Sequence, residues 1–110
     1  MSEWLIYIVV ALHVVFFVLE SMLWTRPQIR RAFELTAEEA ETTKVLALNQ
    51  GGYNLGVALM LLWFQHTGNT QGVTVTLVFL ASMGILGAMT ASWRIFLLQT
   101  APALLALGLM

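Results

Sequence analysis

One stretch of the chain, residues 44–63 (KVLALNQGGYNLGVALMLLW), constrains the fold more than any other. It is apolar and long enough to cross a bilayer, yet it carries four polar side chains at hydrocarbon depth. These are Asn49, Gln50, Tyr53 and Asn54, which at helical spacing fall within an arc of roughly 140°. Beside this face lie Gly52 and Gly56, a small-xxx-small pair that lets another helix approach closely. We therefore expect the rest of the chain to supply partners to this polar face.

The composition is that of a membrane protein. Of the 110 residues, 59% are hydrophobic and only 10% are charged, so we expect one integral membrane domain in the lipid bilayer. The net charge of −1 offers no basic field for nucleic acid, and the lack of cysteine excludes disulfide and thiol chemistry. Two histidines without a metal-spacing motif predict no metal site. We also expect no cofactor.

Four apolar segments predict an all-α, polytopic membrane protein with four transmembrane helices in an antiparallel bundle. The predicted spans are about residues 4–24, 44–64, 73–93 and 95–110 of a single domain, 1–110. Small residues in the third span favour close helix contact: Ala81, Gly84, Gly87, Ala88 and Ala91. The fourth span is short, and Pro102 interrupts it, which frees the carbonyl of Leu98 one turn earlier.

The connection at residues 25–43 holds most of the charge, and it fixes the predicted orientation. Four of the five basic residues flank it, so we expect it to be cytoplasmic and both termini to lie outside. The tryptophans agree with this orientation, with Trp24 and Trp93 at the inner interface and Trp4 and Trp63 at the outer one. Within the connection, Thr36 to Glu39 (TAEE) reads as a capping box, which predicts that the second helix begins near Ala37.

Polar residues from all four spans occur at matched depths. Counted from the cytoplasmic end, one layer lies roughly 5–9 Å into the membrane. It contains Glu20, Asn49, Gln50, Thr90 and Gln99. A second layer, roughly 13–17 Å in, contains His13, Tyr53, Asn54 and Ser82. We expect the first two spans to pack directly, with Glu20 facing Asn49 or Gln50 and His13 facing Tyr53 or Asn54.

The two polar layers predict a set of ligand-binding residues, and they leave purely structural interpretations of some of these residues open. The predicted set is His13, Glu20, Asn49, Gln50, Tyr53, Asn54, Thr90 and Gln99. For Thr90, Gln99 and Ser82 alone, interhelical hydrogen bonding without further function is the favoured interpretation. Glu20 lies one turn from the surface and could extend to it, and His13 could be a satisfied core histidine.

Three functions compete. In the preferred one, an inner polar pocket built on Glu20, Asn49, Gln50 and Gln99 binds or transports a small molecule or cation, coupled to protons, and a pathway at this size would need a homodimer. In the second, Glu20 and His13 act as acid and base on a lipid-like substrate. No catalytic motif supports that enzyme. In the third, the layers only specify the fold of a membrane partner protein.

The assembled residues resemble a known family, the small bacterial integral membrane proteins classed as domain of unknown function 1304. The matching pattern includes His13, Glu20 to Trp24 (ESMLW), Phe33, Thr43 to Ala47 (TKVLA), Asn49 to Asn54 (NQGGYN), the Gly84 to Thr90 stretch, Gln99 and Pro102-Ala103. It covers nearly the whole chain, and Gly52 occupies the variable place of the motif. The resemblance implies four membrane helices and a bacterial cytoplasmic (inner) membrane, and it implies no activity.

Overall fold

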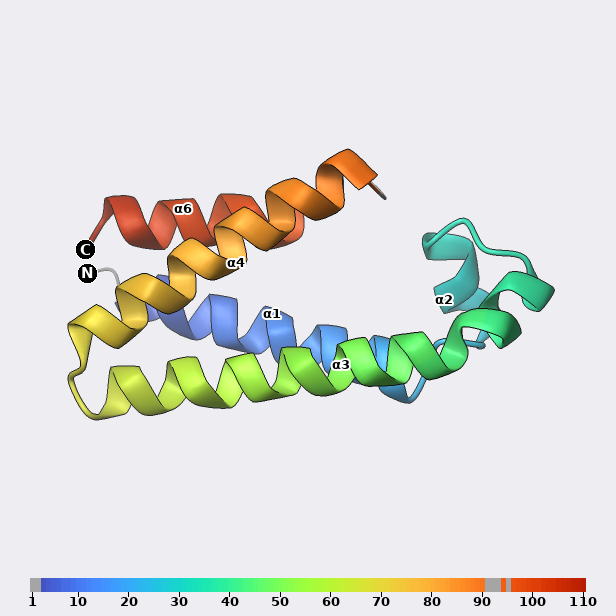
Figure 1. The fold of residues 1–110 in the computed structure, drawn as a ribbon, viewed down its shortest axis with the longest axis horizontal. Helices are drawn as coiled ribbons and strands as arrows, with labels where there is room; N and C mark the ends of the chain where they lie inside the picture. The colour runs from blue at the N-terminus through green and yellow to red at the C-terminus, as the bar shows by residue number, and fades with distance from the viewer. Residues whose placement is uncertain (1–2, 91–93, 95) are drawn as a thin grey trace. The chain divides into compact units, whose positions relative to one another are not determined.

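The computed structural model describes residues 3–90, 94 and 96–110, and the elements within them are all helical. In chain order they are α1 (Glu3–Ser21), α2 (Pro27–Ala32), α3 (Ala37–His66), α4 (Thr70–Thr90), the π-helix η1 (Phe96–Thr100) and α6 (Ala101–Gly108) (Figure 1). The predicted all-α class is therefore confirmed. Ala91, Trp93 and the start of the fourth predicted span at Ile95 lie outside the described residues.

Three helices, α1, α3 and α4, are long and apolar enough to cross a membrane. The fourth predicted span corresponds to a shorter apolar helical segment, Leu97–Gly108. Its first part is the π-helix η1, and Pro102 follows in the first turn of α6. Because proline has no N–H to donate, the regular hydrogen-bond ladder is interrupted one turn before it, and the wider π turn occurs there.

The capping box predicted at the start of the second long helix is confirmed. The backbone N–H of Thr36 donates to Oε1 of Glu39 at 2.9 Å, and the backbone N–H of Glu39 donates to Oγ1 of Thr36 at 3.0 Å. These two bonds satisfy amide groups that a helix start leaves without partners, so α3 begins at Ala37, as predicted. By contrast, α1 ends at Ser21, three residues before the predicted boundary at Trp24.

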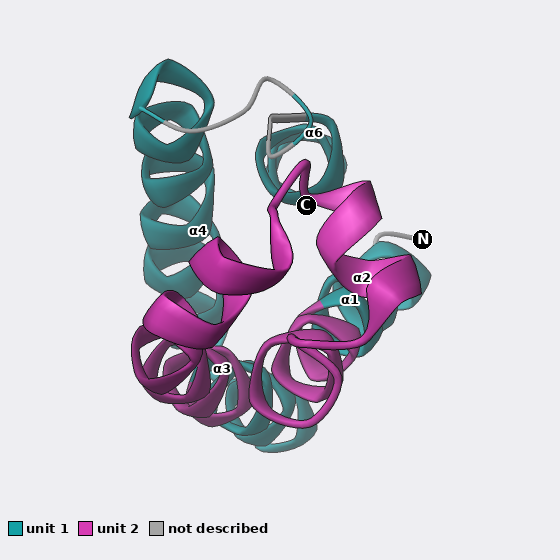
Figure 2. Ribbon diagram, turned by 90° about the vertical axis from the view of Figure 1, so that its right-hand side faces the viewer, with its two compact units in different colours: residues 1–12, 57–110 teal, residues 13–56 magenta. Residues whose placement is uncertain are grey.

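The chain divides into two compact units (Figure 2). Unit 1 comprises residues 1–12 and 57–110, and all four apolar segments contribute to its core. The buried core residues are Leu5, Ile6, Val9, Leu61, Val73, Leu77, Leu80, Ala81, Ala103 and Ala106. Within this unit α4 packs against η1 and α6. Small residues on α4 and α6 make close packing possible, since alanine and glycine add little bulk between backbones.

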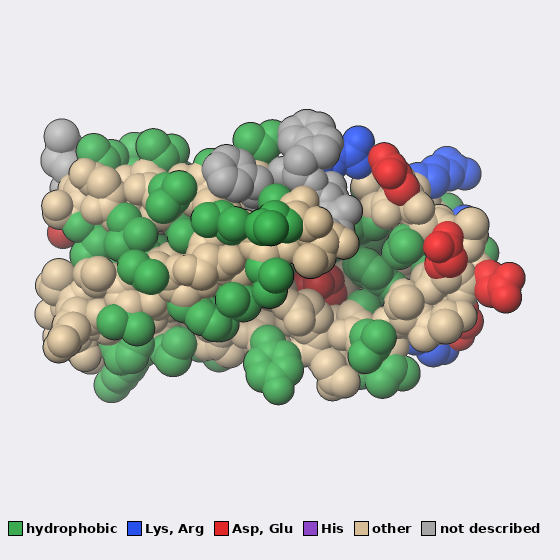
Figure 3. Space-filling model, turned by 45° about the horizontal axis from the view of Figure 1, so that its top comes forward, with side chains coloured by type: hydrophobic (Ala, Val, Ile, Leu, Met, Phe, Trp, Pro, Cys, Tyr) green, Lys and Arg blue, Asp and Glu red, His purple; other side chains and the backbone are tan. Residues whose placement is uncertain are grey.

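Unit 2 comprises residues 13–56 and contains the end of α1, all of α2 and the first part of α3. The indole Nε1 of Trp24 donates to Oγ1 of Thr43 at 3.0 Å, and the Trp24 ring lies 5.1 Å from that of Phe33. Ala40 and Ala47 on α3 are buried. Most charged side chains on the face drawn in Figure 3 gather over α2 and the beginning of α3, which is the charged connection identified from the sequence.

Candidate functional site

Glu20 and Asn54 form the polar contact in unit 2 on which the candidate site is built. Glu20 is the penultimate residue of α1, and Asn54 lies in the apolar part of α3. The Nδ2 amide of Asn54 donates to Oε1 of Glu20 at 2.5 Å, and both side chains are partly buried. A carboxylate between two apolar helices needs such a donor, because leaving it without one is costly.

A close approach of the two helices at Gly51 brings this pair together. A Cβ atom placed on Gly51 would lie 2.1 Å from Oγ of Ser21 and 3.1 Å from the backbone oxygen of Phe17, so no larger residue fits without a shift. Ser21 also donates to the carbonyl of Leu48 at 3.3 Å, which ties α1 to α3 one turn earlier. Asn54 follows Gly51 by three residues on the same face of α3, and this spacing directs its amide toward Glu20.

The partner of Glu20 differs from the predicted one. Glu20 was expected to face Asn49 or Gln50, but both of these side chains are exposed, and Asn54 donates instead. The physical reason is the position of the closest approach. Gly51 faces α1, so Asn54 faces it too, whereas Asn49 and Tyr53 lie on the other side of α3, where Tyr53 is 74% exposed.

The glycine pair that suggested close packing also behaves differently from expectation. A Cβ added to Gly52 or to Gly56 would meet nothing within 4 Å in the described part of the chain. Gly51, the neighbouring glycine in the same motif, is the position that permits contact between α1 and α3. The sequence shows two adjacent glycines, Gly51 and Gly52, but helical spacing does not say which of them faces a partner helix.

His13 is buried, with 1% of its surface exposed, and its ring lies edge-on to Phe16 at 5.1 Å. It shares a helix with Glu20, seven residues away, which separates the two by roughly 10 Å along the axis. This ring contact is with its own helix, and the pairing of His13 with Tyr53 or Asn54 stays a prediction. One substrate would have to reach across that distance to meet both groups.

Thr90, Ser82 and Gln99 belong to unit 1, where their hydrogen bonds go to backbone carbonyls. Thr90 and Ser82 donate within α4, to Leu86 and Val78 respectively. Gln99 donates from Nε2 to the carbonyl of Leu80 at 3.0 Å and so joins η1 to α4. This is the helix-joining role that the sequence favoured for Gln99. The same role was favoured for Thr90 and Ser82, but the bonds described for them stay within α4.

Thr100 is a packing residue that sequence reasoning missed. It is fully buried and donates from Oγ1 to the carbonyl of Ala81 at 3.1 Å, beside the bond made by Gln99. A Cβ on Gly84 would lie 2.0 Å from that same hydroxyl oxygen, so α4 and η1 lie close together at Gly84. The small residues of the third span correctly predicted a close helix contact there. The sequence did not indicate that Thr100 would lie opposite them.

The chemistry open to the Glu20–Asn54 pair is that of a carboxylate with one remaining acceptor. Among the described residues, Oε2 of Glu20 makes no hydrogen bond, so it is available to a proton, a cation or a donor group of a ligand. In the described part of the chain, no three His, Cys, Asp or Glu side chains lie close enough together to hold a metal ion. The pair therefore suits a proton or a ligand bound by one carboxylate.

Comparison with known proteins places the chain among proteins described as "Protein of unknown function (DUF1304)", whose family model matches residues 7–110. No curated protein matches the sequence, and no solved structure matches the fold. The match covers both members of the candidate pair and the whole NQGGYN motif.

Proposed function

The chain belongs to the DUF1304 family, and we propose that it is an integral membrane protein that binds a small molecule or cation at Glu20 in a proton-coupled manner. The observation that carries this proposal is the hydrogen bond between Asn54 and Glu20, which joins two helices that are each long and apolar enough to cross a membrane. Ionisable side chains in such helices usually mark a binding or transport pathway, because their burial is costly.

The acidic character of Glu20 supports a binding role over a packing role. A glutamine would accept the same bond from Asn54 without the cost of an ionisable group, so packing alone does not require a carboxylate at this position. The hydrogen bonds of Ser21, Gln99 and Thr100 also join helices, and they use neutral groups. All three side chains donate to backbone carbonyls, so a neutral side chain can join helices in this chain.

The proposed setting is a bacterial cytoplasmic membrane that the chain crosses four times, with both termini outside and residues 25–43 inside. The bias of Arg and Lys toward that connection supports this orientation. Trp4 and Trp63, 58% and 63% exposed, lie near the ends of α1 and α3 that are proposed to face outward. Tryptophan at such positions is typical of an aromatic belt.

A second copy of the chain is the proposed partner, because one bundle of this size has little room for a conduit. The exposed face of α3 supports it, since the Asn49 amide carries both a donor and an acceptor and could pair with its own copy. Cross-linking tests this point. Tyr53→Cys should give a disulfide-linked dimer in membranes, and a chain that stays monomeric would contradict it.

The function is tested by comparing Glu20→Gln with the wild type in detergent. We expect Na⁺ or K⁺ to raise the thermal unfolding temperature of the wild type by an amount that changes between acid and alkaline pH, and Glu20→Gln to remove both the cation effect and its pH dependence. Glu38→Gln, which removes an exposed carboxylate in the charged connection, is the matched control and should retain both. If Glu20→Gln behaves like the wild type, Glu20 has no proton-linked role.

A structural role is the second candidate, and the bonds of Gln99 and Thr100 favour it for unit 1. In that case Glu20→Gln is silent or mildly stabilising, because it removes an ionisable group while it keeps the bond to Asn54. Gln99→Leu would still destabilise the fold. The two candidates therefore differ in the response of Glu20→Gln, not in the response of Gln99→Leu.

A further inference from the structure

The charged connection in unit 2 carries two arginines one helical turn apart on α2. The backbone N–H of Arg30 donates to the carbonyl of Arg26 at 2.9 Å, which fixes this spacing. Residues four positions apart lie on the same side of a helix, with Cβ atoms about 5–6 Å apart. Arg31 follows Arg30 directly and is turned about 100° away from it around the axis. Arg26 and Arg30 are therefore a pair that can bind one group together, and Arg31 is not part of that pair.

The charges of this arginine pair are not neutralised within the described part of the chain. No described carboxylate forms an ion pair with Arg26 or Arg30. Two of the four glutamates of the connection are engaged elsewhere, because Glu41 pairs with Lys44 and Glu39 belongs to the cap of α3. Arg26 is exposed and Arg30 is partly buried. The pair is thus open to an anion, and the forked geometry of guanidinium groups matches the oxygens of a phosphate.

Hydrogen bonding and ring packing hold α2 at the level where the second predicted span begins. The indole Nε1 of Trp24, which precedes α2, donates to Oγ1 of Thr43, the residue before the predicted span 44–64. The ring of Phe33, which follows α2, lies 5.1 Å from the Trp24 ring. Both ends of α2 are therefore joined to this part of α3. In the membrane setting proposed above, this is the level of the lipid headgroups.

Exposed apolar side chains lie beside the arginine pair. By helical spacing, Ile29 and Phe33 share an arc of roughly 100° with Arg26 and Arg30. Phe33 is 44% exposed, and Met22, just after α1, is 66% exposed. Basic groups next to exposed apolar ones are typical of a segment that lies in the membrane interface. This face of α2 is therefore suited to a phosphate with acyl chains attached to it.

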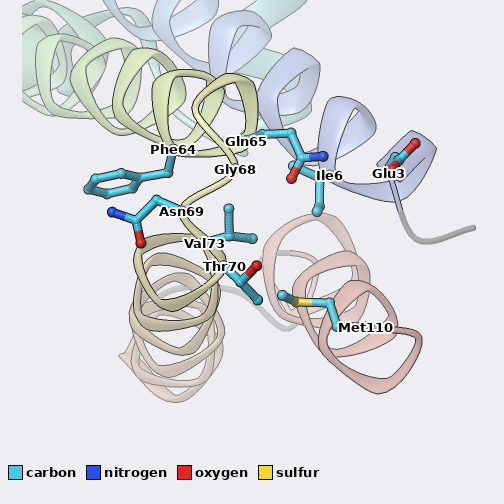
Figure 4. Close-up of a pocket in the computed structure, with 9 residues that line it drawn as sticks. All are labelled: Glu3, Ile6, Phe64, Gln65, Gly68, Asn69, Thr70, Val73 and Met110. Atoms are coloured by element: carbon cyan, nitrogen blue, oxygen red, sulfur yellow. The ribbon is translucent and has the colours of Figure 1, made fainter.

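A hollow of about 370 Å³ in unit 1, at the turn between α3 and α4, offers no comparable set of charges (Figure 4). Among its lining residues, all of which the structure describes, none is Lys or Arg, and Glu3 has the only charged side chain. The Glu3 carboxylate is directed away from Gln65 and Thr70, so these polar groups do not converge on one point. We assign no site to this hollow.

We propose that Arg26 and Arg30 bind the phosphate of an anionic phospholipid headgroup, with the exposed ring of Phe33 against its acyl chains. The proposal rests on the membrane setting proposed above and not on any role of Glu20. Residues 25–43 hold three arginines and four glutamates, so this connection has no general basic field. A preference for anionic lipid therefore has to come from the arginine pair itself, which makes the pair separable from Arg31 by mutation.

The test is native mass spectrometry of the full chain in detergent, titrated with phosphatidylglycerol. We expect saturable retention of one phosphatidylglycerol, and less retention of phosphatidylcholine, which carries its own cation beside the phosphate. Arg26→Gln and Arg30→Gln should each weaken phosphatidylglycerol binding about fivefold. Arg31→Gln removes the same charge from another side of α2 and should leave binding unchanged. Equal weakening in Arg31→Gln, or equal retention of phosphatidylcholine, overturns the proposal.

Two controls separate loss of binding from other effects. The thermal unfolding temperature of each variant is measured without lipid, and Arg26→Gln should keep the wild-type value because Arg26 is exposed. Arg26→Gln therefore carries the test even if Arg30→Gln, at a partly buried position, does not fold. Inorganic phosphate at the same concentration should not displace phosphatidylglycerol. Displacement would indicate a site for free phosphate and overturn the lipid assignment.

Failure of this site is distinguishable from failure of the proposed function. Glu20→Gln should bind phosphatidylglycerol like the wild type, whatever its effect on cation binding. In nanodiscs of mixed phosphatidylcholine and phosphatidylglycerol, we expect the released protein to retain phosphatidylglycerol preferentially. A chain that enters nanodiscs without this preference overturns the arginine site alone. A chain that does not enter them overturns the membrane setting and the arginine site together.

Discussion

Asn54 donates a hydrogen bond to Glu20 across thirty-four positions of sequence and so links the end of α1 to the apolar part of α3. The link depends on Gly51, one turn earlier on α3, because only a residue without a side chain lets the two backbones come close enough. The candidate site is thus a product of packing. A residue with no chemistry of its own determines which polar side chain reaches the carboxylate.

Asn54→Leu should destabilise the fold by about 1–3 kcal/mol, because it leaves the partly buried carboxylate of Glu20 without its donor. Asn49→Leu makes the same change at an exposed position of the same helix and should alter the stability of the monomer by less than about 0.5 kcal/mol. Thermal unfolding in detergent measures both. Equal losses would show that Asn54 has no special relation to Glu20.

Gly51→Ala should cost about 1–3 kcal/mol, because its Cβ would overlap Oγ of Ser21 and press on the backbone of Phe17. Gly52→Ala is the matched control. Nothing lies within 4 Å of its added Cβ, so it should be neutral or stabilising by up to about 1 kcal/mol through helix propensity. The double variant Ser21→Ala/Gly51→Ala should recover part of the loss, and a failure to recover any would place the strain at the Phe17 carbonyl.

Gln99→Leu and Thr100→Val should each weaken the contact between η1 and α4 by about 0.5–1.5 kcal/mol, because each removes a donor to an α4 carbonyl. Thr90→Val is the control, since the hydrogen bond of Thr90 to Leu86 lies within α4 and Thr90 is exposed. It should change stability by less than about 0.5 kcal/mol. Unfolding in detergent checks the set, and a larger loss in Thr90→Val than in Thr100→Val would contradict the assignment.

The capping box at the start of α3 should respond to pH. Glu39 precedes the predicted span, and the hydrogen bond from the Thr36 backbone holds its pKa below the ordinary value of 4.5. Because the pKa is lowered in the folded state, the contribution of the cap is present above the unfolded pKa and is lost as the pH falls through the folded pKa. NMR titration of Glu39 should show this lowered pKa. Thr36→Ala keeps the backbone donor and removes only the contribution of the Thr36 side chain, so it should raise the pKa of Glu39 part of the way toward the ordinary value. An ordinary pKa for Glu39 in the wild type would contradict the cap.

Labelling of single cysteines should establish the orientation, since the chain has none of its own. We expect Gln71→Cys, in the first turn of α4, to react with an impermeant thiol reagent added outside, and Glu38→Cys to react only after the cytoplasmic side is opened. Both side chains are exposed in the structure, so burial within the protein would not prevent either cysteine from reacting. The reverse pattern would invert the proposed topology.

The sequence by itself determined the apolar helical segments, the beginning of α3 and the family. Apolar runs of span length, a TAEE capping box and a proline are local signals, and each acts through backbone hydrogen bonds or through burial of its own segment. It also identified Glu20 and the NQGGYN motif as the polar residues that need partners. All of this depends on neighbours in the chain and needs no knowledge of how the helices are packed.

The tertiary structure alone decided which residues of the motif meet Glu20. A helix that is apolar nearly all round has no hydrophobic face to orient it, so helical spacing groups Asn49 with Tyr53 and Gly51 with Asn54 without saying which pair faces α1. The contact is set by steric fit at Gly51 against Ser21 and Phe17, a relation between segments thirty residues apart. For the same reason Thr100 was recognisable as a partner of Gly84 only after η1 and α4 were seen together.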